Sequence, residues 1–457
     1  MNLPRRIRAM MIIGTILAAF LFASCATAPN AAESLTLNVA PGNGAHFRDI
    51  VYEGNDGKLY TVDAEGNAPP VPLVAVSNVF RPTTLEFSLP LWSPDGNQVA
   101  FVVRSQAEGE GVHDTIYVAR EGRDKIVSLF DSTQSRTIYL QWVPGQQIIS
   151  FLSASGGAGD LVLSTVRTDT AAVTPIVRGN PLYYHWGPGG SRLAVHADGP
   201  AVGTEAASGQ IAVGERRGGK MQFQEIDPLP TFFRAPAFSP DGTMFAAATV
   251  GPGGNNTLAL VSSSGKYLRS LAALSGFASF GWSAGGNYVA VLEQSNAGSS
   301  GISSGTLRVV KARVSGLQVA LHEADGEALS KNAVAFFWSP AQDRLAYLEP
   351  VLVRGSGEQK GKVGLKLSVW TPHDGIITEV GPFPPAPLFV SRVLPYFDQY
   401  DRSASIWDPA GNRLVVNALT EDGSPGIYVV DLTHTPARVQ IIAAGSVPFW
   451  KPAAARR

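Results

Sequence analysis

The sequence contains a single cysteine, Cys25, in 457 residues, so no disulfide can form within one chain. Charge is also scarce: only 16% of residues are charged, and 36 Lys and Arg nearly balance 37 Asp and Glu. This balance excludes the strongly basic surface that nucleic-acid-binding proteins present, and we predict no nucleic-acid partner. Long apolar runs are missing too. The run at residues 9–22 has 14 residues, whereas a membrane-spanning helix needs about 20.

Residues 1–24 predict a secretory signal. Three arginines at positions 5, 6 and 8 precede the apolar run, which ends in Phe-Ala-Ser-Cys25. Small residues before a cysteine resemble the lipobox of bacterial lipoproteins, in which the signal is cut before the cysteine and its thiol carries a diacylglycerol. The resemblance implies lipidation at Cys25, followed by a flexible tether over residues 25–45. Phe22 departs from the Leu that is usual there, and a plain signal peptide is the alternative.

This resemblance predicts an exported protein that the lipid alone anchors to the bacterial cell envelope. Residue 26 is Ala, and lacks the Asp that retains many such lipoproteins in the inner membrane. In an organism with two membranes, we therefore expect the outer membrane.

Glycine and proline, in contrast, are abundant, at 48 and 32 residues, and many of them belong to one repeated motif. The fullest copies have an aromatic residue followed by Ser-Pro-Asp-Gly, with an apolar residue seven places after the aromatic and a small residue next. The copies start 43 to 69 residues apart. Their aromatic residues are Trp92, Trp142, Trp186, Phe238, Trp282, Trp338, Trp407 and Trp450.

Each part of the motif has a structural role. The aromatic ends a short strand and offers a large surface for burial against the next unit. Pro and Asp-Gly form a tight turn, so that the chain reverses into a hairpin. Two further strands follow in each unit, for example residues 115–118 and 126–129. Four strands per repeat predict an all-β propeller, a single domain over residues 46–457.

The two ends of this domain predict how the ring closes. Residues 49–52, 58–62 and 71–76 resemble the last three strands of a unit, and residues 446–450 resemble a first strand. Joined in one sheet, they would remove an exposed sheet edge. Counting this composite unit, we predict eight blades, with seven as the alternative if one segment is degenerate.

The W-S-P-D-G…A-F pattern resembles the WD40-like repeats of TolB-type propellers, over about residues 47–452. The resemblance implies the propeller but not a role in the Tol system, because no region here matches the α/β domain of TolB. Similar repeats form the propeller of prolyl-oligopeptidase-like enzymes. The chain ends just after the predicted closing strand, and we expect no hydrolase domain.

Sequence motifs for catalysis or metal binding are not evident. Residues 301–305 match G-x-S-x-G, but they lie in a Gly/Ser run and are expected to form a loop. The seven histidines lack metal-ligand spacing. We predict a non-catalytic protein without metal or cofactor. A site built from distant blades would leave no motif, so an envelope enzyme that acts on saccharides or peptides is the alternative, as is a solute-capturing lipoprotein.

Basic residues precede most of the motif aromatics, in the loops that should enter the innermost strands. Converging on one mouth of the channel, they would attract a carboxylate, a phosphate or an acidic partner. The alternative is a set of solvated side chains that pair with nearby acids. The residues are Arg81, Arg136, Arg178, Arg234, Lys331 and Arg402.

The longest unit, residues 338–407, supplies a second candidate. It carries Tyr396, Phe397, Asp398 and Tyr400 just before an innermost strand. Rings beside an acid suit recognition of a protein or a sugar, although they could instead cover the edge of an enlarged blade. We therefore expect a monomeric recognition or scaffold module, whose channel face binds an envelope protein or an anionic small ligand.

Overall fold

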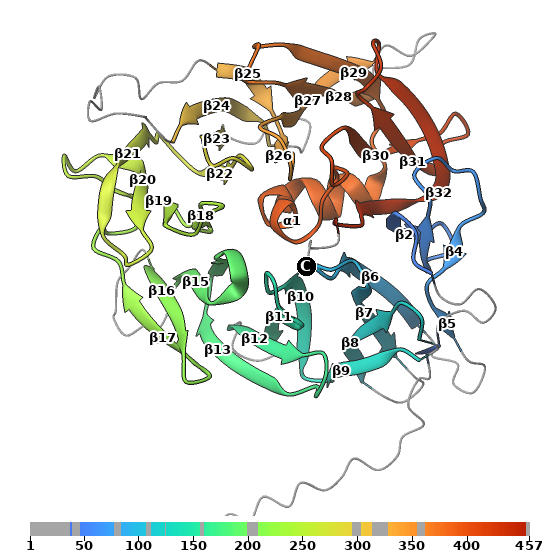
Figure 1. The fold of residues 1–457 in the computed structure, drawn as a ribbon, viewed down its shortest axis with the longest axis horizontal. Helices are drawn as coiled ribbons and strands as arrows, with labels where there is room; N and C mark the ends of the chain where they lie inside the picture. Colours follow the sequence, from blue (N-terminus) through green and yellow to red (C-terminus); the bar gives the residue numbers. More distant parts are fainter. Residues whose placement is uncertain are drawn as a thin grey trace, which may run out of the picture.

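The computed structural model describes residues 37–38, 46–76, 84–106, 111–123, 125–155, 160–198, 209–294, 303–312, 328–353 and 362–453. These residues form a β-propeller in which antiparallel sheets stand around a ring and one short helix occupies the centre (Figure 1). The predicted lipidation site Cys25 and the signal before it lie outside the described residues. Among the helices that are described, none has the length and apolar character needed to cross a membrane.

Six sheets have four strands each, and every strand is hydrogen-bonded to its neighbour in sequence. The first three sheets are β6 (Thr84–Trp92), β7 (Gln98–Gln106), β8 (Val112–Arg120) and β9 (Val127–Ser132); β10 (Ser135–Trp142), β11 (Ile148–Ser155), β12 (Leu161–Arg167) and β13 (Val173–Gly179); and β14 (Leu182–Trp186), β15 (Arg192–Ala197), β16 (Gln210–Arg217) and β17 (Lys220–Glu225). A single 3-10 turn, η1 (Pro188–Gly190), follows β14.

The next three sheets repeat the same order. They are β18 (Ala237–Phe238), β19 (Met244–Val250), β20 (Asn256–Ser262) and β21 (Tyr267–Ala273); β22 (Ala278–Trp282), β23 (Tyr288–Gln294), β24 (Gly305–Lys311) and β25 (Ala328–Ala333); and β26 (Ala335–Trp338), β27 (Leu345–Val353), β28 (Lys362–Trp370) and β29 (Ile377–Phe383). The first strand of each sheet lies nearest the centre and the fourth lies at the rim (Figure 1).

The motif turns connect the first two strands of these sheets. After Trp92, the hydroxyl of Ser93 donates a hydrogen bond to Asp95, and the amide of Gly96 donates to the carbonyl of Ser93 over 2.8 Å. Gly96 has a φ of 71°, a conformation that glycine adopts without the steric cost of a Cβ. The Ser-Pro-Asp-Gly sequence thus closes the turn through its own side chains.

Most of the motif tryptophans join their sheet to the one before it. The indole Nε1 of Trp142 donates to the carbonyl of Leu91 over 3.1 Å, and that of Trp338 donates to Gly281 over 3.0 Å. Trp186 reaches the preceding sheet through Ser150, whose hydroxyl accepts from the indole and donates to a carbonyl of β10. In most repeats the aromatic is therefore both a core side chain and a hydrogen-bonded link between sheets.

The seventh sheet closes the ring and has six strands. In order, they are β30 (Arg413–Leu419), β31 (Pro425–Asp431), β32 (Arg438–Trp450), β2 (Ile50–Gly54), β3 (Leu59–Val62) and β4 (Val71–Pro72). A separate pair joins β1 (Leu37–Asn38) to β5 (Ala75–Val76). Strands from both ends of the chain thus meet in one sheet, which confirms the predicted closure.

The described residues form seven blades, so the prediction of eight is wrong and the alternative of seven is right. The reason lies in β32, which is one continuous strand. Its residues 438–444 pair with β31, and its residues 445–450 pair with β2. Inside the second half, where the pairing with β2 shifts in register, Val447 has a φ of 51°, which bends the strand without ending it. Because no turn interrupts β32, two predicted units share one sheet.

The innermost position of this seventh sheet is filled by two separate stretches of chain. The amide of Leu419 donates to the carbonyl of Pro384 over 2.8 Å, and that of Val415 donates to Ile406 over 2.8 Å. The chain between these stretches, residues 387–405, leaves the sheet and enters the centre of the ring. It forms η3 (Phe389–Val393), η4 (Leu394–Tyr396) and α1 (Phe397–Ser403).

Candidate functional site

Helix α1 fills the channel and is fixed to blades on several sides. The Arg402 guanidinium donates through Nη1 to the carbonyl of Pro236 over 3.1 Å and through Nη2 to that of Phe280 over 3.3 Å. On another side, the Tyr139 hydroxyl donates to the carbonyl of Gln399 over 2.8 Å. We call residues 387–405 the plug, because α1 occupies the position where other propellers leave an open channel.

Aromatic rings of the plug pack into the same core as the blades. Phe397 is 1% exposed and meets Phe336 edge-on, with ring centroids 5.1 Å apart. Tyr400 is stacked on Phe449 at 5.9 Å. Tyr396, in contrast, remains 51% exposed. Of the aromatic stretch singled out in the sequence, Phe397 and Tyr400 thus form core contacts and only Tyr396 offers a ring to solvent.

A cavity of about 490 Å³ lies between the plug and the starts of the inner strands of three blades. We call it the mouth cavity. Its lining residues are Glu86, Ser88, Arg104, Arg136, Thr137, Ile138, Tyr139, Leu152, Leu161, Pro181, Leu182, Tyr183, Ser391, Arg392, Tyr396, Gln399 and Tyr400. Three arginines and one glutamate share its wall with aliphatic and tyrosine side chains.

Two of the three arginines are already paired. Arg104 holds Asp114 with two hydrogen bonds of 2.7 and 2.8 Å. Arg392 contacts Glu86 at 2.8 Å and Glu53 at 3.3 Å. Arg136 is exposed, and in the described part of the chain it makes no ion pair or side-chain hydrogen bond. It is therefore the cation of this cavity that is available to a ligand.

Three tyrosines that line the mouth cavity, Tyr139, Tyr183 and Tyr400, are neutral at physiological pH because burial raises the pKa of each. Burial raises the pKa of Tyr400 to about 12, and it raises the pKa of Tyr139 further. Tyr183 is half-buried, and burial raises its pKa as well. These residues therefore contribute ring surface and hydroxyl groups but no charge.

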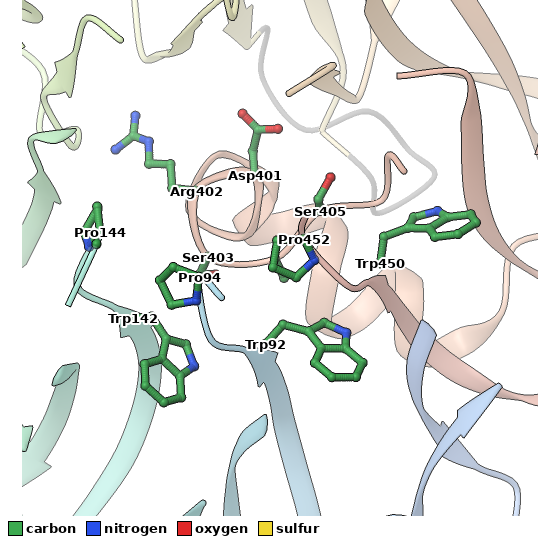
Figure 2. A pocket seen from close by; sticks show the side chains of 12 residues that line it. Trp92, Pro94, Trp142, Pro144, Asp401, Arg402, Ser403, Ser405, Trp450 and Pro452 are labelled. Atoms are coloured by element: carbon green, nitrogen blue, oxygen red, sulfur yellow. The ribbon is translucent and has the colours of Figure 1, made fainter. Parts of the chain in front are cut away.

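A second cavity, of about 300 Å³, lies at the other end of α1, beside the motif turns (Figure 2). Asp401 and Arg402 project from α1 near prolines 94, 144 and 452. The pKa of Asp401 is raised to about 7, chiefly by burial; Arg402 opposes the rise and the nearby charge of Asp398 adds to it. Asp398 itself accepts a hydrogen bond from Ser279 over 3.2 Å.

The predicted basic residues are distributed over several positions. Arg136 lines the mouth cavity and Arg402 is held inside the channel. Arg234 donates to the side chain of Gln294 over 3.0 Å. Arg178 and Lys331 are exposed on the rim strands β13 and β25. Arg81 lies outside the described residues.

Reasoning from sequence missed the plug, although a helical signal was present. Phe389, Val393, Phe397 and Tyr400 are all buried and recur at helical spacing. It also missed Arg392, which the plug brings to the mouth cavity, and Arg104, which comes from the second strand of its blade. Within the described ranges, no group of three or more His, Cys, Asp or Glu residues could hold a metal ion.

No family model and no curated protein matches the chain. Several solved structures share its fold. A prolyl endopeptidase is 11% identical, with a TM-score of 0.49, and the match covers 78% of this chain and 50% of that one. The dihydro-heme d1 dehydrogenase NirN is 13% identical, with a TM-score of 0.49, and the match covers 90% of this chain and 76% of that one.

TolB from Acinetobacter baumannii is 14% identical, with a TM-score of 0.34, and the match covers 78% of this chain and 83% of that one. At these identities the likeness concerns the fold alone. The functions of these proteins differ, and none of them is assigned to this chain by the likeness. The chain is a seven-bladed β-propeller, and the solved structures that are similar to it in fold include TolB proteins and a prolyl endopeptidase.

Proposed function

We propose that this protein is a lipid-anchored, non-catalytic recognition module of the cell envelope, whose mouth cavity binds an anionic ligand with an apolar body. The observation that carries the proposal is the position of Arg136, an exposed and unpaired guanidinium among the described residues, beside aliphatic and tyrosine side chains. The sequence around Cys25 supports the anchor.

The composition of the cavity favours a ligand of mixed character. Leu152, Leu161 and Leu182 offer aliphatic contacts, and Tyr396 adds an exposed ring. Apolar side chains with a few polar groups that fix orientation are typical of small-molecule sites. A carboxylate can form a bidentate pair with a guanidinium, so Arg136 would orient the anionic end.

The enzyme alternative has less support. Hydrolysis of a saccharide by paired carboxylates needs two acids that face one scissile bond. Among the described residues that line the mouth cavity, Glu86 is the sole acid, and it is paired with Arg392. In the second cavity, Asp401 has a raised pKa, but no other acid of the described chain lines that space. The charges of the mouth therefore favour binding.

A matched pair of small probes tests the proposal. N-acetylphenylalanine carries a carboxylate and a ring, and N-acetylphenylalaninamide differs from it by lacking the charge. In ligand-observed saturation-transfer NMR, we expect the acid to give a clear signal with the wild type and the amide a signal several-fold weaker.

Arg136→Glu should abolish the signal of the acid, because it reverses the charge that attracts the carboxylate. Arg178→Glu is the matched control, since Arg178 is also exposed but lies on a rim strand. Equal signals from the two probes, or an acid signal that survives Arg136→Glu, would refute anion recognition at this cavity.

A further inference from the structure

An aromatic patch adjoins the mouth cavity. It consists of Phe232, Phe233, Arg234 and Phe277, together with Leu229 from the same segment that leads into β18, and we call it the aromatic patch. Leu229 is 71% exposed and Phe277 is 53% exposed, whereas large apolar side chains are usually buried. Exposed and half-buried apolar residues beside an arginine have the composition of a protein-binding surface.

Ring contacts connect the patch to the mouth cavity without a break. Tyr183 lines the cavity and packs against Phe233, with ring centroids 5.5 Å apart. The guanidinium of Arg234, the next residue, lies 5.9 Å from the ring centroid of Phe277. Phe277 in turn contacts Phe232 at 5.5 Å. The surface thus extends from the third blade to the fifth.

The same part of the fold supplies both regions. Residues 226–236 lead into β18 and residues 274–277 lead into β22, both of which are first strands of their sheets. Arg136 and Tyr183 lie near the starts of β10 and β14, which are also first strands. Because the first strands of a propeller run in the same direction, their starts lie on one face. The patch and the cavity therefore lie on the same face of the propeller.

The charge of the patch indicates what a partner would carry. Arg234 donates from Nη2 to the amide oxygen of Gln294, and its Nε is buried without a hydrogen-bond partner among the described atoms. No carboxylate of the described chain lies within ion-pair distance of it. A guanidinium that is held on a ring and lacks an acid is complementary to an acidic side chain.

We infer that the mouth cavity and the aromatic patch together bind an extended polypeptide segment of a partner protein, with an acidic residue between apolar side chains. The part of this inference that involves Arg136 rests on the proposed function. An extended chain could place one acidic group at Arg136 and another at Arg234, with apolar side chains on Tyr183 and Phe277. A peptide of several residues could span the blades between these two arginines, whereas one compact ligand could not.

A library of random 12-residue peptides displayed on phage tests this inference. After selection on the wild-type protein, we expect enriched sequences with one or two acidic residues flanked by Leu, Phe, Tyr or Trp. The affinities of enriched peptides are then measured by fluorescence anisotropy. Peptide binding should weaken at least tenfold in the double variant Leu229→Ser, Phe277→Ser, whose changes fall on exposed side chains and leave the core intact.

The control variant Leu268→Ser, Ile376→Ser removes two apolar side chains of similar exposure elsewhere, 48% and 57%, and should bind peptides as the wild type does. Failure to enrich acidic and apolar sequences, or equal affinity in the Leu229→Ser, Phe277→Ser variant, would overturn the inference. Dimerisation of the wild type that this variant abolishes, measured by light scattering, would assign the patch to a second copy and would also overturn it.

The small probes separate this result from the proposed function. A variant Leu229→Ser, Phe277→Ser that loses peptides but keeps the N-acetylphenylalanine signal supports both statements. If peptide binding depended on Phe277 but N-acetylphenylalanine gave no signal, anion binding in the mouth cavity and the role of Arg136 would be refuted. The aromatic patch alone would then remain as the binding surface.

Discussion

Replacing Phe397 with alanine tests whether the plug is part of the propeller core or a detachable segment. The side chain is 1% exposed and meets Phe336 and Phe337 edge-on, with centroids 5.1 and 6.1 Å apart. Removing a buried phenylalanine costs about 3–5 kcal/mol of unfolding free energy, through lost transfer energy and the cavity left behind. The variant also loses two ring–ring contacts, each of which contributes about 0.5–1.5 kcal/mol, so we expect a loss of unfolding free energy near the upper end of this range.

Denaturant unfolding is the suitable assay for this variant. With an unfolding entropy of about 2.1 cal/mol/K per residue over roughly 400 residues, a loss of about 4 kcal/mol moves Tm by only about 5 °C. Urea titrations of the wild type and Phe397→Ala, monitored by tryptophan fluorescence, report the free energy directly.

The neighbouring exposed ring supplies the control. Tyr396→Ala removes a side chain that is 51% exposed, and it should change the unfolding free energy by less than about 0.5 kcal/mol. If Phe397→Ala cost no more than Tyr396→Ala, the plug would contribute nothing to the stability of the ring, and our description of it as core would be wrong.

Three further predictions concern other parts of the chain. Cys25→Ser should move the protein from the membrane fraction to the soluble fraction, and continued membrane retention would contradict a lipid anchor. Truncation after Gly445 removes the part of β32 that pairs with β2, so the midpoint of urea unfolding should fall sharply; an unchanged midpoint would contradict the closure. Because the folded pKa of Asp401 is raised from 3.8 to about 7, wild-type stability should decline from pH 4 to pH 7 relative to Asp401→Asn, and a constant difference would contradict the burial of this carboxyl.

The propeller itself could be predicted from sequence because its signals are local. The Ser-Pro-Asp-Gly turn closes through contacts among neighbouring residues, as between Ser93 and Asp95, and related turn sequences follow the aromatic residue of the other repeats. The apolar and small residues after the turn follow from the packing of one sheet on the next. The closing strand was also predictable, since residues 446–450 match the strand before a motif tryptophan.

The blade count and the plug depend on long-range contacts that no short pattern encodes. Nothing before residue 450 marks β32 as one strand shared by two units, because a bend at Val447 needs no turn sequence. The plug has a helical pattern, but Pro395 interrupts it, and its place in the channel is set by distant partners such as Pro236 and Phe280.

The candidate site was predictable only in part, for the same reason. Arg136 lies at the start of the first strand β10, close to the loop that the repeat indicates, and the structure places it at the mouth cavity. Arg402 precedes a motif aromatic in the same way, yet it lies inside the channel because the plug, not a loop, carries it there. Sequence spacing gives the position of a residue in its repeat. It does not give the path of an insertion.

The plug also bears on how the mouth cavity would bind. Hydrogen bonds from Tyr139 to Gln399 and from Arg402 to two blades hold one wall of the cavity against the others. Arg392, on the plug, is fixed by ion pairs to Glu53 and Glu86 from two different strands. A cavity whose walls are fixed before binding loses little conformational entropy when a ligand enters. The paired arginines would therefore serve to hold the cavity in shape, and the unpaired Arg136 would be the group that meets the ligand.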